Sequence, residues 1–259
     1  MELSVEYHHI PEMQQSSPPS GTVALSGAPG EVPWQGEDIA LAVPAALCGI
    51  IVLVLLAGLG LGIAALATGT EIDRTILGIA VAVSVDVALL GSVWWFAVAR
   101  RKATLASLGF RGMARAPRWV IPAAIAGCLG IAITYGVVVD ALDPPEFFKS
   151  NGLFEDGMAT WAVALFAALA IVAAPLVEET FFRGFVFSGL RRRMGFRGAA
   201  GLSAFIFALA HLEPITFLPI FAIGIALAWV YSATDSLVAP MLVHAAYNGT
   251  VVAIGLATR

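Results

Sequence analysis

Charged residues are scarce in this chain of 259 residues. Asp, Glu, Lys and Arg make up 12% of it, whereas soluble domains hold about 25%. Apolar residues make up 59%, and the mean hydropathy is +0.88. So few charges cannot cover a water-facing surface, which excludes a soluble globular enzyme and predicts a polytopic membrane protein. With 14 basic and 18 acidic residues the net charge is −4, which argues against a nucleic-acid partner.

Cysteine is nearly absent, and basic residues are missing from the first part of the chain. Cys48 and Cys128 lie in separate apolar stretches without CxxC spacing, so we interpret them as small core residues rather than a disulfide or metal site. Residues 1–37 contain no Lys or Arg and therefore lack the basic region of a secretory signal peptide. Their Pro, Ser and Gly content predicts a disordered tail.

Seven apolar segments follow the tail and predict an all-α bundle of about seven transmembrane helices. An eighth helix would arise if the long first segment broke near Pro44 or within residues 58–62. A bilayer core needs about 20 residues per helix, and some of these segments are shorter. The segments are 39–67, 76–99, 119–139, 158–187, 199–212, 215–231 and 237–256.

The basic residues predict the orientation of the bundle. The loops at residues 100–118 and 191–197 hold ten of the 14 Lys and Arg residues, and short loops rich in these residues face the cytoplasm. The tail would then be cytoplasmic, and the acidic stretches 71–74 and 140–156 would lie on the far side. Asp86, within the second segment, has no role in this scheme.

Ionisable side chains inside the apolar segments are the most informative feature of the sequence. Burying a charge in hydrocarbon costs at least about 2.5–3.5 kcal/mol, so such residues are functional candidates. They gather in the last three-fifths of the chain. They are Glu178, Glu179, Arg183, His211 and His244, with Asn248 one turn beyond the last histidine.

Helical geometry assigns different surroundings to the two glutamates. Glu179 and Arg183 are four residues apart, on one face, and can form an ion pair that supports the site. Glu178 is rotated by about 100° and faces elsewhere. Phe207 lies one turn before His211, where its ring would shield the histidine.

Three helices bring these groups to a similar depth. Counted from the basic loops, Glu178 and His211 lie about 20 Å into the bundle, and Asn248 lies equally far from the turn at Asp235. This set would suit amide hydrolysis accessible from the cytoplasmic side. Glu178 would activate water with the help of His211, and His244 and Asn248 would donate to the oxyanion. The competing interpretation is that the groups only hold the helices together.

Three motifs in this order resemble those of the CPBP family of intramembrane proteases, the CAAX-protease and bacteriocin-processing (Abi) group. They are EExxxR at 178–183, FxxxH at 207–211 and HxxxN at 244–248. The resemblance covers residues 158–257 and implies catalytic helices there, after N-terminal transmembrane helices at 38–157. It implies an endopeptidase for membrane-associated substrates, including prenylated ones. Glu178 and His211 would activate water, and His244 and Asn248 would form the oxyanion site.

Other functions stay open at this point. Glu178, His211 and His244 could supply the His₂Glu set of a zinc protease, although HExxH is absent, and we favour chemistry without a cofactor. A membrane scaffold or immunity protein could keep the site without turnover. A proton-coupled transporter would use buried acids and histidines too, but no repeated pair of broken segments is evident.

Overall fold

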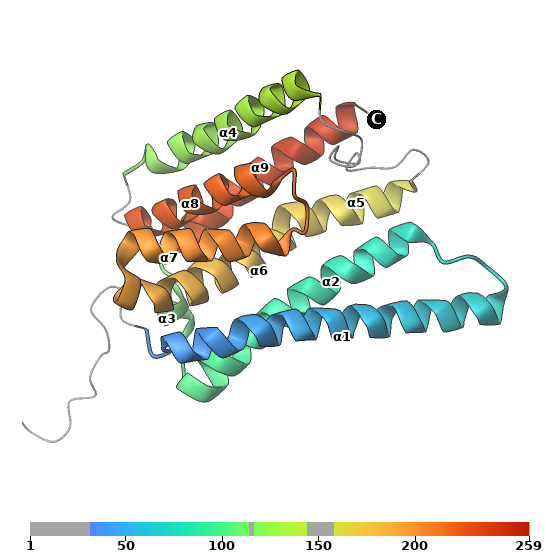
Figure 1. Ribbon diagram of the computed structural model, residues 1–259, viewed down its shortest axis with the longest axis horizontal. Coiled ribbons are helices and arrows are strands. Elements are labelled where there is room, and N and C mark those ends of the chain that lie inside the picture. Colours follow the sequence, from blue (N-terminus) through green and yellow to red (C-terminus); the bar gives the residue numbers. More distant parts are fainter. Residues whose placement is uncertain (1–31, 114–116, 144–157, 259) are drawn as a thin grey trace, which may run out of the picture.

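The structure is a computed structural model that describes residues 32–113, 117–143 and 158–258. Within these ranges the chain is helical and has no strands, as the composition predicts (Figure 1). Three of the elements are π-helical and are labelled η. In chain order the elements are α1 (Gly36–Thr68), α2 (Arg74–Val93), η1 (Trp94–Ala99), α3 (Leu105–Leu108), α4 (Val120–Leu142), α5 (Thr160–Ala168), η3 (Leu169–Ala173), α6 (Ala174–Glu179), η4 (Thr180–Phe187), α7 (Ser188–Ala210), α8 (Phe217–Thr234) and α9 (Val238–Ala257).

Six helical stretches of the described chain are long and apolar enough to cross a bilayer, one fewer than the seven segments expected. The difference lies in residues 160–210, which form one stretch by hydrogen bonding but turn at Gly195, where φ is 64° and ψ is −174°. The two arms pack together, and Ser203 Oγ in the second arm donates a hydrogen bond of 2.8 Å to the carbonyl of Phe182 in the first. The fourth and fifth predicted segments are therefore both present, as two arms of this stretch in a multi-pass membrane protein.

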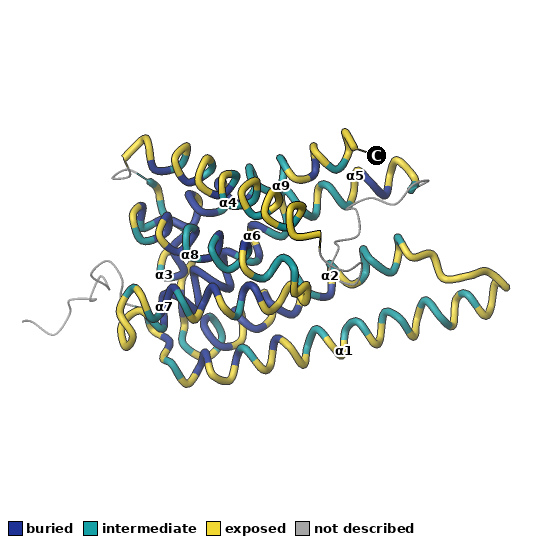
Figure 2. Tube along the Cα trace, turned by 45° about the horizontal axis from the view of Figure 1, so that its top comes forward, coloured by how far each residue is buried: buried dark blue, intermediate teal, exposed yellow. Residues whose placement is uncertain are grey.

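Helix α1 is continuous for 33 residues and passes through Pro44, so a break there does not create an eighth helix. At 1.5 Å per residue it is about 50 Å long, well beyond the roughly 30 Å of a hydrocarbon core. With α2 it forms a hairpin whose far half extends past the other helices, and many of its apolar side chains are exposed (Figures 1 and 2). Lipid is the natural environment for this surface.

The packed chain begins before the predicted end of the tail. Residues 1–31 lie outside the described part, but residues 32–37 contact the bundle. Trp34 is buried, and its Nε1–H donates to the carbonyl of Phe185 at 2.9 Å. The backbone N–H of Gln35 is bound by the Asp38 carboxylate at 2.8 Å, which begins α1. A single tryptophan anchor thus orders a segment whose Pro and Gly content predicts disorder.

Pro175 explains the π-helical turn η3 that precedes α6. A proline in a helix lacks an N–H and clashes with the carbonyl four residues earlier, so the regular pattern cannot persist. In η3 the N–H of Ala174 bonds to the carbonyl of Leu169. By the same spacing the carbonyl of Ala170 would need the N–H of residue 175, which is the proline. The carbonyl of Ala170 is therefore left for a donor from another helix.

Both basic loops lie at one end of the bundle. Arg101 binds Asp38 at the start of α1 at 2.9 Å, and Arg111 binds Asp235 in the α8–α9 turn at 2.7 Å. Arg193 also lies against the start of α1. We call this region the basic end. Its location on the cytoplasmic side of the membrane stays a prediction.

Candidate active site

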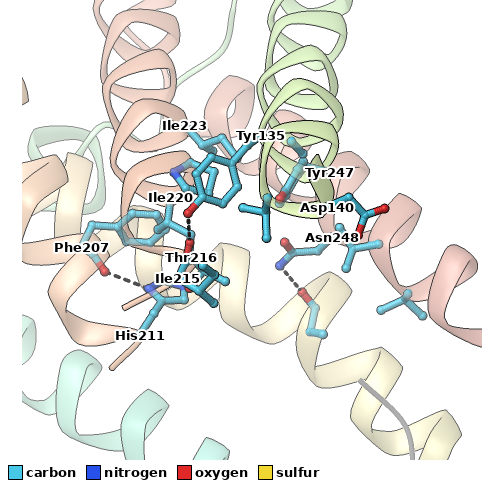
Figure 3. A pocket seen from close by; sticks show the side chains of 17 residues that line it. Tyr135, Asp140, Phe207, His211, Ile215, Thr216, Ile220, Ile223, Tyr247 and Asn248 are labelled. Atoms are coloured by element: carbon cyan, nitrogen blue, oxygen red, sulfur yellow. Dashed lines mark hydrogen bonds between the residues drawn. The ribbon is translucent and has the colours of Figure 1, made fainter. Parts of the chain in front are cut away.

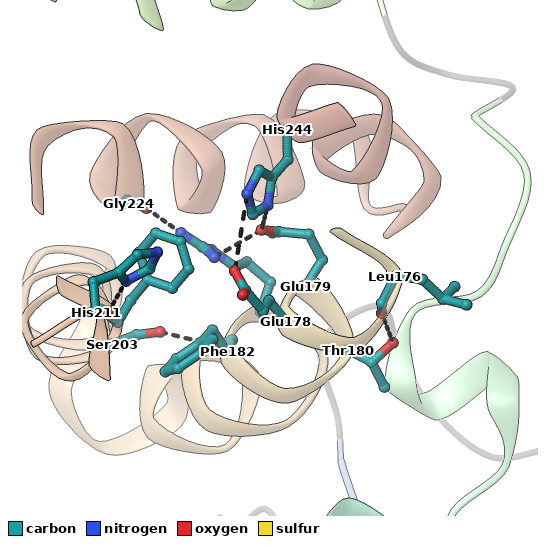
Figure 4. Close-up of polar contacts among 11 residues, drawn as sticks. Leu176, Glu178, Glu179, Thr180, Phe182, Ser203, His211, Gly224 and His244 are labelled. Atoms are coloured by element: carbon teal, nitrogen blue, oxygen red, sulfur yellow. Dashed lines mark hydrogen bonds and ion pairs between the residues drawn. The ribbon is translucent and has the colours of Figure 1, made fainter. Parts of the chain in front are cut away.

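A fully buried ion pair forms the base of the site (Figure 4). Arg183 Nη1 lies 2.8 Å from Glu179 Oε1, which confirms the pair expected from their spacing. Arg183 Nη2 also donates to the carbonyl of Gly224 in α8 at 3.0 Å. The guanidinium lies over the ring of Phe207 in α7, 4.6 Å from its centre. One arginine therefore links the EExxxR helix to two neighbouring helices.

His244 of α9 lies between the two glutamates. Its Nδ1 is 2.9 Å from Glu179 Oε1, and its Nε2 is 3.8 Å from Glu178 Oε2. Because a carboxylate can only accept, Nδ1 carries the proton of this hydrogen bond, and Nε2 points toward Glu178. The sequence did not predict the contact with Glu179, since it joins residues 65 positions apart. Glu179 thus binds both Arg183 and His244 through a single oxygen.

Glu178 has no such partner. Its side chain is 17% exposed, and its buried Oε2 accepts no hydrogen bond from the described residues. A buried carboxylate oxygen without a donor is costly, so the position suits a water molecule or a substrate group. Glu179 Oε2 is likewise buried without a hydrogen bond, so the two glutamates differ in their other contacts: Glu179 is paired through Oε1 with Arg183 and His244, whereas Glu178 lies no closer than 3.8 Å to His244.

The sequence suggested that Phe207 would shield His211. In the structure its ring lies between the two imidazoles instead. Its buried ring lies 4.8 Å from the His211 ring and 5.9 Å from the His244 ring, centre to centre. His211, at the end of α7, is exposed because the chain leaves the helix there. Its Nδ1 bonds to the carbonyl of Phe207 at 2.8 Å and must donate, so Nε2 of the neutral ring keeps a lone pair.

Asn248 supplies the donor that the carbonyl of Ala170 lacks. Its Nδ2 donates to this oxygen at 2.8 Å, across the interface between α9 and η3. Pro175 leaves the carbonyl of Ala170 without a backbone donor, and this explains why α9 has a carboxamide at position 248. A carboxamide has two N–H groups and a carbonyl oxygen, so one N–H and the oxygen stay free for another ligand.

A cavity of about 650 Å³ adjoins the site, and His211, Phe207 and Asn248 lie on its wall (Figure 3). The rest of the wall comes from α4, Ala170 of η3, the α7–α8 turn, the first half of α8 and the second half of α9. Tyr135 of α4 donates a hydrogen bond to the carbonyl of Ile215, which fixes the α7–α8 turn at the cavity. Most of the lining side chains are apolar, and this suits a ligand with an apolar part. Tyr135 was missed by the sequence analysis, although its polar end within an apolar segment is a usable signal.

Among the residues that the structure describes, none from the basic end lies on the wall of this cavity. The exposed Asp140, in the last turn of α4, lies on the wall, and α4 runs away from the basic end. The described wall residues and the basic loops therefore lie toward different ends of the bundle, and the predicted access to the site from the cytoplasmic side stays a prediction.

The zinc alternative would need Glu178, His211 and His244 around one point. No three His, Cys, Asp or Glu side chains in the described ranges are grouped in this way. Nδ1 of His244 is bound to Glu179, and the Phe207 ring lies between the two imidazoles. As arranged, these residues do not fit a zinc site with three protein ligands.

Comparisons with known proteins agree with the motifs. Residues 160–250 match the family described as Type II CAAX prenyl endopeptidase Rce1-like. The chain is 33% identical over 97 residues to the membrane-embedded CAAX protease MroQ of Staphylococcus aureus, covering 35% of this chain and 39% of that protein. It is 30% identical over 95 residues to YdiL of Bacillus subtilis, itself provisionally assigned as a membrane peptidase, covering 37% of this chain and 39% of that protein. The matches thus span well under half of each relative, and no solved structure matches the chain at the same level.

Proposed function

We propose that this chain is an intramembrane endopeptidase of the CPBP family that hydrolyses peptide bonds of membrane-associated substrates, since residues 160–250 match the Rce1-like family and both relatives are membrane peptidases by name. The observation that carries the proposal is the contrast between the two glutamates. Glu179 binds Arg183 and His244 through Oε1, whereas Glu178 has no hydrogen bond at its buried Oε2, which lies 3.8 Å from His244 Nε2. A purely structural cluster has no use for the second carboxylate.

In the proposed reaction Glu178 takes a proton from a water molecule. His211 lies on the cavity side of Phe207, and in the proposal the water occupies the space between Glu178 and His211, where the lone pair on Nε2 of His211 accepts its second hydrogen. The water oxygen bonds to the carbonyl carbon, and the carbonyl oxygen becomes an oxyanion. The C–N bond then breaks, and the proton held by Glu178 passes to the leaving amine. The reaction thus consumes one water molecule and one peptide bond and yields one carboxyl and one amino terminus, without a cofactor.

His244 and the free N–H of Asn248 would stabilise the oxyanion. With a proton on Nε2 as well as Nδ1, His244 carries a positive charge, and Glu178, Glu179, Arg183 and His244 together then carry no net charge. A balanced cluster is the form that a low-dielectric interior tolerates best. Glu179 and Arg183 hold this arrangement without touching the substrate.

The proposal includes a cell membrane location with the basic end in the cytoplasm, because that end holds the basic loops. The bilayer and a membrane-associated protein or peptide are the partners. A prenylated substrate is one candidate class. A scaffold or immunity protein would keep the same helices but would not cleave, so turnover decides between them.

The test compares membranes from cells that make the wild-type chain or its Glu178→Gln variant, which keeps size and shape. New protein N-termini in the membrane fraction are quantified by mass spectrometry. We expect termini that depend on Glu178 and disappear in the variant. Identical terminus profiles at equal protein levels would refute the peptidase and favour the scaffold.

A further inference from the structure

We propose that the substrate enters from the side of the membrane opposite the basic loops, so that this protein cleaves peptides or membrane-protein segments exposed on the non-cytoplasmic side. The inference rests on the proposed function. It concerns the cavity that holds His211 and Asn248, and it names the leaflet from which the scissile bond arrives.

The wall residues locate the cavity along the bundle. On α4 they are Ala132, Tyr135, Gly136, Val139 and Asp140, all in the second half of the helix, which ends at Leu142. On α9 they lie in the second half of the helix, from Tyr247 to Val252. Both helices start near the basic end and run away from it (Figure 1), so these residues lie toward the opposite end.

Differences in helix length create the hollow. After Gly195 the second arm of α7 has 15 residues, 196–210, and is about 22 Å long, whereas the 23 residues of α4 reach about 34 Å. The α7–α8 turn therefore ends below the level reached by α4. The hydrogen bond from Tyr135 to Ile215 holds the turn at that depth. His211 and Thr216 are thus on the wall of a cavity whose residues on α4 and α9 lie in the halves of these helices away from the basic end.

The other direction is filled with side chains. Leu227, Val230 and Val243, toward the basic end from the cavity, are completely buried. Nearer the loops, Leu237 is buried against Tyr231, and its N–H bonds to the carbonyl of Gly109 at 2.8 Å. A Cβ at Gly109 would come within 2.6 Å of the Tyr231 hydroxyl, so this plug has no spare room. A peptide approaching from the basic end would have to displace it.

Charge gives the direction a biological meaning. The described part of the basic end has nine Lys and Arg residues in its two loops, and such loops stay in the cytoplasm. Asp140 at the cavity has the opposite sign. A cytoplasmic prenylated C-terminus would meet the closed end. An exported peptide or the outer flank of a membrane-spanning segment would meet the open one.

Cysteine labelling tests the direction without relying on turnover. The full-length chain is made with Cys48→Ala and Cys128→Ala, and single cysteines are added by Asp140→Cys, Thr216→Cys or, as the matched control at the basic end, Arg192→Cys. Each variant is first shown to be folded by its elution as a single species in detergent. Intact cells and inverted vesicles are then treated with a membrane-impermeant maleimide.

We expect the cysteines at 140 and 216 to react at least tenfold faster in intact cells than in inverted vesicles, and the cysteine at 192 to show the reverse. Faster reaction of 140 and 216 in inverted vesicles, or reaction at neither position from outside, would overturn the proposed entry side. That result would leave the peptidase proposal intact, because Glu178-dependent termini are measured separately. Such termini mapping to cytoplasmic segments would also overturn the entry side.

Discussion

Replacing Glu179 should lower the unfolding free energy of the protein more than replacing Glu178, although the two residues are adjacent. Glu179 Oε1 is the acceptor for Arg183 at 2.8 Å and for His244 at 2.9 Å, and both members of the ion pair are completely buried. In Glu179→Ala the arginine stays buried without its counter-ion, a change that costs about 3–5 kcal/mol of unfolding free energy. Glu178→Ala removes a carboxylate without a hydrogen-bonded partner, so we expect a loss of under about 1 kcal/mol.

A double variant separates the charge from the packing. Glu179→Ala with Arg183→Met removes both charges and fills part of the space with an apolar chain. Breaking one partner of a buried pair is worse than replacing both. The double variant should therefore be more stable than Glu179→Ala alone, which means a coupling energy of about 1–3 kcal/mol within the cycle. Glu179→Gln, which keeps an acceptor, should lie between the single variant and the wild type.

The assay is unfolding of the purified variants in mixed micelles as the mole fraction of SDS is raised, followed by far-UV circular dichroism. Membrane insertion of every variant is checked first by its resistance to carbonate extraction. Equal losses of stability in Glu178→Ala and Glu179→Ala would refute the division of roles. A double variant less stable than Glu179→Ala would refute the claim that an unpaired arginine causes the loss.

Three further predictions follow from contacts in the site. Asn248→Ala should lower kcat by about 10²–10³ with little change in KM. It should also cost about 1–3 kcal/mol of unfolding free energy, because the carbonyl of Ala170 loses its donor, and activity near the wild-type level would contradict a role of Asn248 in the oxyanion site. Exhaustive chelation should leave Glu178-dependent cleavage unchanged, and loss of cleavage that zinc restores would revive the metal mechanism. Gly224→Ala should destabilise the protein and weaken cleavage. The added Cβ would lie 2.9 Å from Ala204 Cβ and would shift the carbonyl of residue 224 that Arg183 binds. A fully active variant with unchanged thermal stability would contradict this.

The sequence by itself determined the fold class and most of the candidate site. The scarcity of charge indicated a membrane, and the seven expected segments recur in the described chain as six spans, the fourth and fifth being the two arms of one stretch. The pairing of Glu179 with Arg183 was predictable because a helix fixes the geometry of residues four apart. The motifs at 178–183, 207–211 and 244–248 are local, so reading them requires no knowledge of the packing.

Only the tertiary structure decided which partners meet across helices. The bond from His244 to Glu179 and the bond from Asn248 to the carbonyl of Ala170 join residues 65 and 78 positions apart, and no helical periodicity encodes them. The exposure of His211 and the direction of the cavity also depend on where α7 ends relative to α4. Apolar composition places a residue in the membrane, but it does not tell whether the residue faces lipid or another helix, because both surroundings are apolar. Helix contacts therefore determine which side of the site is open.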